Sequence, residues 1–576
     1  MANPCNLSNS WPAWQTRGMT TIETYDAVII GGGHNGLVAA AYLGKAGKRV
    51  LLLERLDAVG GAAVSAQAFE GVEAWLSRYS YLVSLLPQRI IDDLGLDITL
   101  VRRRYSSYTP DPADPTRGLL VDNDDPAATA ASFLRIGAAD TEFDLFERFS
   151  EHCRVLTQAL WPTMTAPLLT RSEAKRLVTD AGGAAVWDAM IERPIGEVIA
   201  RNRQNDVVRG VVLTDALIGT FARATDADLQ QNICFLYHLI GGGTGDWDVP
   251  VGGMGAVTAE LGLAARKAGA TLVTGAEVTA VDPAGVVRYR QGGSEIEVRA
   301  QWILSNVAPA VLDRLLATGT EVSYGREQLA AGEPSVGVFE ARPFGVGSAA
   351  AANPNTSREG AQVKVNLLLS RLPKLRDAAV TGEAAFGGTF HINESWSQLD
   401  DAYLSAAEGG IPNPLPCEIY CHSLTDPTIL SPELRESGAH TLTIFGLQTP
   451  ARLVTAENND EMRDKLQAAV LASLNSVLAE PIEDLFMTDA AGRPCIETRT
   501  TLDIERAVGM PLGNIFHGGL DWPFAEDDAA LNTPAARWGV ATAHPRVLLC
   551  GSGARRGGAV SGIGGHNAAM ALLESE

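Results

Sequence analysis

Three glycines near the start of the chain have the spacing of a turn that binds a dinucleotide. The pattern Gly31-x-Gly33-x-x-Gly36 follows the apolar run 27–30 and precedes the apolar segment 37–43. A buried strand, a glycine turn and a helix are therefore expected in that order. In such a unit the glycines allow a tight turn, a close approach of a pyrophosphate, and close packing of helix on strand. The phosphates would lie at the positive end of the helix.

A glutamate and a second glycine turn follow at the distance that such a site requires. The predicted strand 48–53 ends at Glu54, where a carboxylate can accept both ribose hydroxyls of an adenosine and disfavours the 2′-phosphate of NADP. Arg55 comes next, and Gly60 and Gly61 precede Ala62. The N–H groups of this second turn and the Arg55 cation are suited to phosphate or ribityl oxygens.

The C-terminal end carries a second glycine-rich element. A predicted strand at 546–550 ends in Gly551-Ser552-Gly553, and the run 557–565 opens a final helix. A late strand followed by a glycine-rich helix N-terminus is a second anion site. A ribose-binding unit at one end of the chain and this element at the other suit a cofactor of two parts, which favours FAD over NAD.

Composition limits the other classes of function. The chain has 576 residues and a formal charge of −22, so two or three domains are expected and nucleic acid is disfavoured as a partner. Its seven cysteines contain no Cys-x-x-Cys pair, and their odd number fits a reducing compartment. Cys417, Cys421 and His422 are better read as core residues than as metal ligands, and no metal is expected. Residues 1–23 read as a flexible extension without a signal peptide, and no apolar run is long enough to span a membrane, so a cytoplasmic location is expected.

The remaining segments predict an α/β protein with two interleaved parts. A Rossmann-like FAD-binding domain would hold residues 24–105, 245–310 and 500–576. An inserted, mixed α+β substrate domain would hold residues 106–244, which are largely helical by periodicity, and 311–499. The pattern Gly252-Gly253-x-Gly255 does not predict a second nucleotide site, because no apolar strand leads into it.

Taken together, these motifs resemble those of the phytoene-desaturase-like FAD oxidoreductases, within the wider group that includes amine oxidases. The resemblance runs almost from end to end and is carried by residues 30–40, 54–62, 250–255, 305–309, 423–427 and 557–569. Segments 34–35, 238–243 and 513–518 are similar to one branch of that family. This branch holds carotenoid ketolase-like and desaturase-like bacterial proteins and the eukaryotic pyridine nucleotide-disulphide oxidoreductase domain-containing protein.

The resemblance implies a non-covalently bound FAD in a fold of the GR2 or amine-oxidase type. Val278 would hold the adenine through its backbone, and Ser552 stands where flavoproteins often carry an aspartate. The residues expected to bind the cofactor are Gly31, Gly33, His34, Asn35, Gly36, Glu54, Arg55, Gly61, Ala62, Val278, Gly551, Ser552, Gly553, Gly558, Val560 and Gly562.

The chemistry implied by the resemblance is hydride transfer from a lipophilic, polyene- or isoprenoid-like substrate to flavin N5. His517 is the candidate catalytic residue, with a structural loop histidine as the alternative. His566 is better explained as a polar residue of the last helix. Arg78 and Tyr79 are candidates to line the pocket.

Several alternatives stay open at this point. The protein could be an amine oxidase-like flavoenzyme, or a flavin-binding regulatory or interaction protein with little turnover. Oxygen, a quinone or a carrier would each serve as electron acceptor, and a lipid substrate would allow peripheral contact with a membrane. The residues leave the oligomeric state undetermined.

Overall fold

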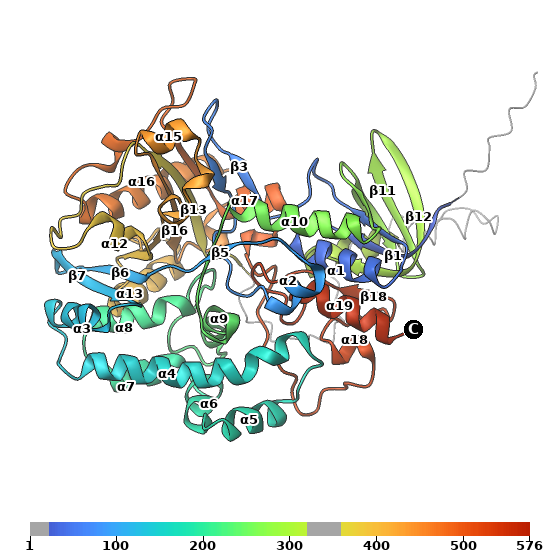
Figure 1. Ribbon diagram of the computed structural model, residues 1–576, viewed down its shortest axis with the longest axis horizontal. Helices are drawn as coiled ribbons and strands as arrows, with labels where there is room; N and C mark the ends of the chain where they lie inside the picture. Colours follow the sequence, from blue (N-terminus) through green and yellow to red (C-terminus); the bar gives the residue numbers. More distant parts are fainter. Residues whose placement is uncertain (1–21, 320–358) are drawn as a thin grey trace, which may run out of the picture.

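The computed structural model describes residues 22–319 and 359–576, and within them the predicted α/β class is confirmed. Nearly all of the predicted extension 1–23, and residues 320–358 of the predicted substrate domain, lie outside the described residues. Figure 1 shows one sheet on the side of β1 and β12, a second sheet on the side of β6 and β13, and a group of helices around α4 beneath them.

The first sheet has a parallel core continued by an antiparallel hairpin. Its core strands pair in the order β18-β12-β1-β2-β9. The long strand β12 pairs with β18 near its C-terminal end and with β11 along its N-terminal half, and β10 pairs with β11. Every residue from Ala27 to Ile30 is buried, as expected for a parallel strand covered on both faces. The bounds are β1 Thr24–Ile30, β2 Val50–Leu53, β9 Thr271–Val273, β10 Glu277–Asp282, β11 Val286–Gln291, β12 Ser294–Ser305 and β18 Val547–Leu549.

The helices α1 (His34–Lys45), α10 (Met254–Lys267) and α19 (Ile563–Glu574) pack together beside this sheet. Helices α1 and α19 touch through backbone, since a Cβ added at Gly565 would lie 1.9 Å from the carbonyl oxygen of Asn35. The two ends of the sequence, which carry the two glycine-rich motifs, are therefore neighbours in space.

The second sheet is mixed and has the order β17-β13-β16-β15-β14-β6-β7. All of β13 is buried, and α16 packs beside it. The bounds are β6 Tyr105–Asp111, β7 Asp114–Asp122, β13 Gln362–Leu369, β14 Thr389–Ile392, β15 Cys417–Tyr420, β16 His440–Leu447, β17 Ile496–Arg499 and α16 Asn459–Val477.

The predicted helical stretch forms a layer of helices, of which α4, α5, α6, α7 and α9 share one apolar core, while α3 and the start of α8 pack against β7. It comprises α3 Pro126–Arg135, α4 Glu142–Leu160, α5 Arg171–Asp180, α6 Ala184–Ile191, α7 Ile195–Asn202, α8 Asp206–Leu213 and α9 Gln230–Leu239. Shorter elements complete the chain: β3 Ser65–Gln67, β4 Trp75–Ser77, α2 Gln88–Leu94, β5 Leu100–Val101, β8 Val249–Pro250, α12 Gly382–Phe386, α13 Trp396–Ala407, α14 His422–Thr425, α15 Pro432–Glu436, α17 Thr501–Val508 and α18 Pro534–Arg537.

None of the described helices combines the length and the apolar character needed to cross a bilayer.

Candidate functional site

The predicted strand, glycine turn and helix are present at the end of β1. Gly31 has a φ of 98°, a conformation that side chains other than glycine rarely adopt, and Gly33 precedes the first turn of α1. A Cβ added at Gly36 would lie 2.4 Å from the carbonyl oxygen of Gly31, so only glycine lets α1 pack this closely on the turn. Asn306 fixes the turn from the next strand, because its Nδ2 donates to Gly31 O at 2.9 Å and to Gly33 O at 3.4 Å.

The second glycine turn is fastened directly to the first. Gly60 N donates to Gly32 O at 2.8 Å. Gly61 has a φ of 60°, and a Cβ added there would lie 3.0 Å from the Cα of Gly33. The two turns therefore form a cradle of bare backbone that a side chain would fill.

Glu54 lies at the end of β2 and closes this cradle. It is 6% exposed; its Oε2 accepts from Gly32 N at 2.7 Å and its Oε1 accepts from Leu56 N at 2.9 Å. A carboxylate has about four acceptor positions, so each oxygen can accept a further hydrogen bond from a ribose hydroxyl. Arg55 is placed differently from the expected phosphate contact, because its guanidinium donates to Ala507 O at 2.7 Å and to Arg506 O at 3.3 Å.

A cavity of about 530 Å³ starts at these turns and extends to the second sheet. Residues from both ends of the chain line it, as a cofactor of two parts requires. Of the residues expected at the site, the lining includes Gly31, Gly33, His34, Glu54, Arg55, Gly61, Ala62, Val278, His517, Ser552 and Val560, and also Tyr79.

The other expected residues lie behind the lining and hold the backbone in place. Asn35 donates through Nδ2 to Gly557 O at 3.3 Å, which ties the two glycine-rich motifs together. A Cβ added at Gly551 would lie 2.8 Å from Asn306 O, and a Cβ added at Gly553 would lie 2.4 Å from Pro309 Cδ, so neither position has room for a side chain. Gly558 packs against Leu520, and Gly562 precedes α19 with a φ of 72°. Gly36, described above, completes this group of expected residues.

Two histidines meet at the cavity wall. Burial lowers the pKa of both His34 and His517 to about 4, and the proximity of His517 contributes to the shift of His34. Both imidazoles are therefore neutral at pH 7. The Nε2 of His34 and the Nδ1 of His517 are buried without a hydrogen-bond partner. Because both histidines line the cavity, a group bound there could supply the missing partners.

Lys364 is a cavity residue that the sequence analysis did not identify. It lies on β13, is 1% exposed, and donates from Nζ to Ser77 O at 3.0 Å and to Ser80 O at 3.3 Å. Burial lowers its pKa to about 7, so a large fraction is a neutral amine at physiological pH. A neutral amine at this wall can accept a proton.

Two other sequence candidates, Arg78 and His566, lie outside the cavity lining, as does the Gly252 loop that was not expected to bind a nucleotide. Arg78 forms an ion pair of 2.5 Å with Glu497. His566 is fully buried in α19, beside Asn567. The backbone N–H of Gly252 donates to Asp426 at 2.7 Å, so the loop before α10 is a structural anchor.

The donor set fits FAD. The glycine cradle and the N-terminus of α1 suit a pyrophosphate, Glu54 suits the ribose of adenosine, and the turn at Ser552 and Val560 extends the same cavity toward the second sheet. Among the described residues, no group of three or more histidine, cysteine, aspartate or glutamate side chains could hold a metal ion.

Comparison with known proteins defines the class first. Residues 29–88 match the NAD(P)-binding Rossmann-like domain. A structure of a putrescine oxidase variant, from a redesign of cofactor binding, has the same fold, with a TM-score of 0.52 and 15% identity over 96% of this chain and 100% of that one. The protein thus shares the fold of an amine oxidase, with a Rossmann-like unit at residues 29–88, and the glycine cradle and Glu54 of that unit fit FAD.

Sequence comparison then defines the family. The chain is 57% identical over 555 residues to the uncharacterized protein Rv0897c of Mycobacterium tuberculosis, covering 95% of this chain and 97% of that protein, and it belongs to that family. It is also 29% identical over 606 residues to the pyridine nucleotide-disulfide oxidoreductase domain-containing protein 2 of Rattus norvegicus, covering 98% of this chain and 96% of that protein.

Proposed function

We propose that this protein is an FAD-dependent oxidoreductase that oxidises a carbon–hydrogen bond of a lipophilic, isoprenoid- or polyene-like substrate. The observation that carries this proposal is the character of the cavity beyond the cradle. Toward the second sheet its walls are aliphatic and aromatic, with Leu82, Ile218, Phe445, Ile515 and Phe516 among them. Such walls favour an apolar substrate and exclude water from the reacting carbon.

FAD, when bound, supplies the hydride acceptor. The chain would hold its adenosine at Glu54, its pyrophosphate at the glycine turns, and its other end near His34, His517 and Lys364. Because the two histidines are neutral, they can donate or accept hydrogen bonds without adding charge. Lys364 is the better candidate for proton acceptor, since its pKa near 7 suits that role at physiological pH.

Amine oxidation is a second candidate, favoured by aromatic rings at the same wall. The rings of Tyr81 and Phe445 lie 4.9 Å apart, those of Tyr81 and Trp247 stack at 6.0 Å, and all three residues line the cavity. Aromatic faces of this kind attract a cationic amine.

Anaerobic reduction of the bound flavin tests these assignments. FAD-loaded protein is mixed without oxygen with a short isoprenoid alkene or with a primary amine of equal carbon number, and the loss of flavin absorbance is followed. Rapid bleaching by the alkene is the expected result. Bleaching by the amine alone would replace the proposal with amine oxidation, and bleaching by neither would indicate a flavin-binding protein with little turnover.

A further inference from the structure

A second cavity, of about 520 Å³, adjoins the cofactor cavity. It is lined by the second sheet on one side and by α4, α8 and α9 on the other. Tyr81, Ile218, His238 and Trp247 line both cavities, so they form a shared partition. The second cavity thus begins where the apolar end of the first one stops.

The inner end of this second cavity holds two carboxyl groups. Glu418, on β15, is 1% exposed, and its Oε2 has no hydrogen-bond partner. Asp215, in the turn after α8, lines the same cavity. Burial raises the pKa of both groups, that of Glu418 to about 8, while neighbouring Tyr420 and Arg103 act on Glu418 in the opposite direction. A buried carboxyl oxygen without a partner is costly unless a ligand supplies one.

The positive and titratable groups around Glu418 compensate it only in part: the Arg103 charge lowers the pKa of Glu418, but burial still raises that pKa above its ordinary value. Arg103 donates from Nε to Trp247 O at 3.0 Å and from Nη1 to Thr389 Oγ1 at 3.1 Å. Within the described residues it forms an ion pair with neither Glu418 nor Asp215. The Nε2 of His391 lies 4.0 Å from Glu418, but burial lowers the pKa of His391 to about 3, so this ring stays neutral. Burial also lowers the pKa of His238.

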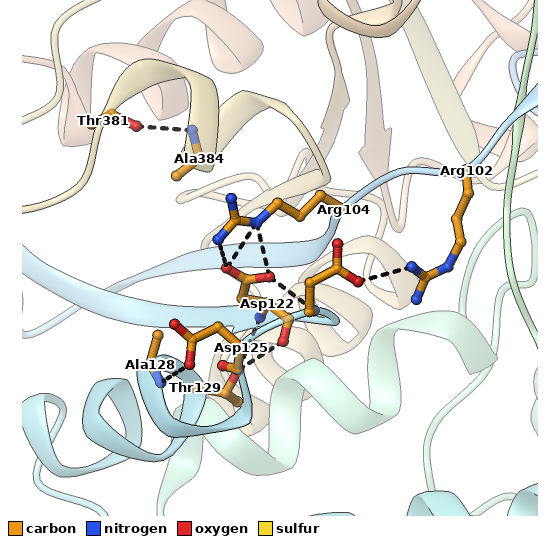
Figure 2. Close-up of polar contacts among 9 residues, drawn as sticks. Arg102, Arg104, Asp122, Asp125, Ala128, Thr129, Thr381 and Ala384 are labelled. Atoms are coloured by element: carbon orange, nitrogen blue, oxygen red, sulfur yellow. Dashed lines mark hydrogen bonds and ion pairs between the residues drawn. The ribbon is translucent and has the colours of Figure 1, made fainter.

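The cations at the rim of the cavity are already paired. The Arg104 guanidinium pairs with Asp122 at 2.8 Å (Figure 2). The Arg102 guanidinium pairs with Asp124 at 3.0 Å. Further along the rim, Arg154 pairs with Glu151. Inside the cavity, the carboxyl groups of Glu418 and Asp215 form no ion pair among the described residues, and neither does the Arg103 guanidinium. Because burial raises the pKa of both carboxyl groups, a bound ammonium group would favour their ionised form.

Aromatic faces line the same cavity as these carboxyl groups. The ring of Tyr81 lies 4.6 Å from that of Tyr420 and stacks on Trp247 at 6.0 Å, and all three line the second cavity. Carboxylates combined with aromatic faces are the surroundings that recognise an ammonium group, through charge-assisted hydrogen bonds and cation–π contacts.

We propose that the second cavity binds an ammonium head group of the substrate at Glu418 and Asp215, while the apolar part of the substrate passes the partition and reaches the flavin. The substrate class is then a cationic amphiphile whose head is recognised and not oxidised. This inference rests on the proposed function, because it takes FAD as the occupant of the first cavity.

Calorimetric binding of matched eight-carbon probes to the FAD-loaded protein tests this proposal. n-Octylammonium should bind at least tenfold more tightly than octanoate or 1-octanol. Glu418→Gln and Asp215→Asn should each weaken n-octylammonium at least tenfold without changing the FAD content. Asp144→Asn is the matched control, since it makes the same change at an exposed carboxylate of α4 outside the cavity, and it should leave binding unchanged.

If octanoate binds more tightly than n-octylammonium, and Arg103→Gln abolishes that preference, the proposal is wrong and the cavity binds an anionic head group. Equal affinities for all three probes, or n-octylammonium binding that survives both cavity substitutions, would show that no ammonium site exists. A protein that binds no FAD would contradict the proposed function instead, and the flavin content of each sample separates these two failures.

Discussion

Replacing Gly36 by alanine tests whether the close contact between α1 and the glycine turn creates the phosphate site. The added Cβ would lie 2.4 Å from Gly31 O and 2.8 Å from Asn306 Nδ2. Real Cβ atoms essentially never approach other heavy atoms to under 3.0 Å, so α1 and the turn must separate by about 0.6 Å. The N-terminus of α1 and the turn carbonyls held by Asn306 would then move apart.

Two opposing effects set the expected magnitude. Alanine in a helix interior gains roughly 0.5–1 kcal/mol over glycine, whereas overpacking costs about 1–3 kcal/mol. A modest net loss of folding stability follows. Losing one charge-assisted hydrogen bond to the pyrophosphate removes about 1.5–3 kcal/mol of binding free energy, which raises the Kd for FAD roughly ten- to hundredfold.

Fluorescence titration of the apoprotein with FAD measures this Kd, and chemical denaturation measures stability. Gly262→Ala in α10 is the matched control, because its added Cβ would meet only ordinary contacts of 3.5 Å and 3.6 Å, with Arg266 and Val59. That variant should be as stable as the wild type or slightly more stable, and it should bind FAD normally. Wild-type FAD affinity in Gly36→Ala would refute the reasoning, as would an equal loss in both variants.

Three further predictions concern other groups of the site. Glu54→Gln should raise the Kd for FAD about tenfold, because a neutral amide accepts ribose hydroxyls less strongly, while Glu277→Gln, at an exposed carboxylate on the same cavity, should leave titrations unchanged. Asn306→Asp should weaken FAD more than Asn306→Ala does in the same titration, since it places an acceptor against the carbonyls of Gly31 and Gly33; equal effects would contradict this role. Burial lowers the pKa of Lys364 from 10.5 in the unfolded chain to about 7 in the folded protein. Between pH 7 and pH 10.5 the lysine is therefore protonated in the unfolded chain and largely neutral in the folded protein, so the free energy of unfolding of the wild type should rise with pH across that range. Lys364→Met should remove that rise, which denaturation at pH 6 and pH 9 would detect; an unchanged slope would place the lysine in a solvated environment.

The nucleotide end of the site was predictable because its determinants are contiguous. The spacing of Gly31, Gly33 and Gly36 predicts a tight turn between a strand and a helix, and Glu54 follows at the end of the next strand. The C-terminal glycine turn has an equally contiguous pattern, and the structure places its Ser552 and Val560 in the cavity wall; its role as an anion site stays a prediction. That this turn would lie against α1 followed only from the expectation that one cofactor joins both ends of the chain.

The rest of the site depends on contacts between distant segments. The polar residues Gln362, Lys364 and Asn366 alternate with apolar ones, a pattern typical of a strand with one solvated face, yet all three are buried. Tertiary packing decided their environment. Glu418 and Asp215 become neighbours only when β15 packs near the turn after α8. No local sequence pattern predicts that these two segments lie close together.

Arg55 shows a different limit of sequence reasoning. Its position after Glu54 favours a phosphate contact, but its guanidinium is held by two main-chain carbonyls at the end of α17. Those carbonyls lie more than four hundred residues further along the chain, so only the folded structure reveals the competing partner.

The flavin content of the purified protein is the most direct test that this chain binds FAD. The protein is unfolded, the released cofactor is identified by chromatography, and its amount is compared with the amount of protein; apoprotein is also titrated with added FAD. One FAD per chain, released intact without a covalent link, is the expected result. A protein that carries no flavin and binds none on titration would contradict it.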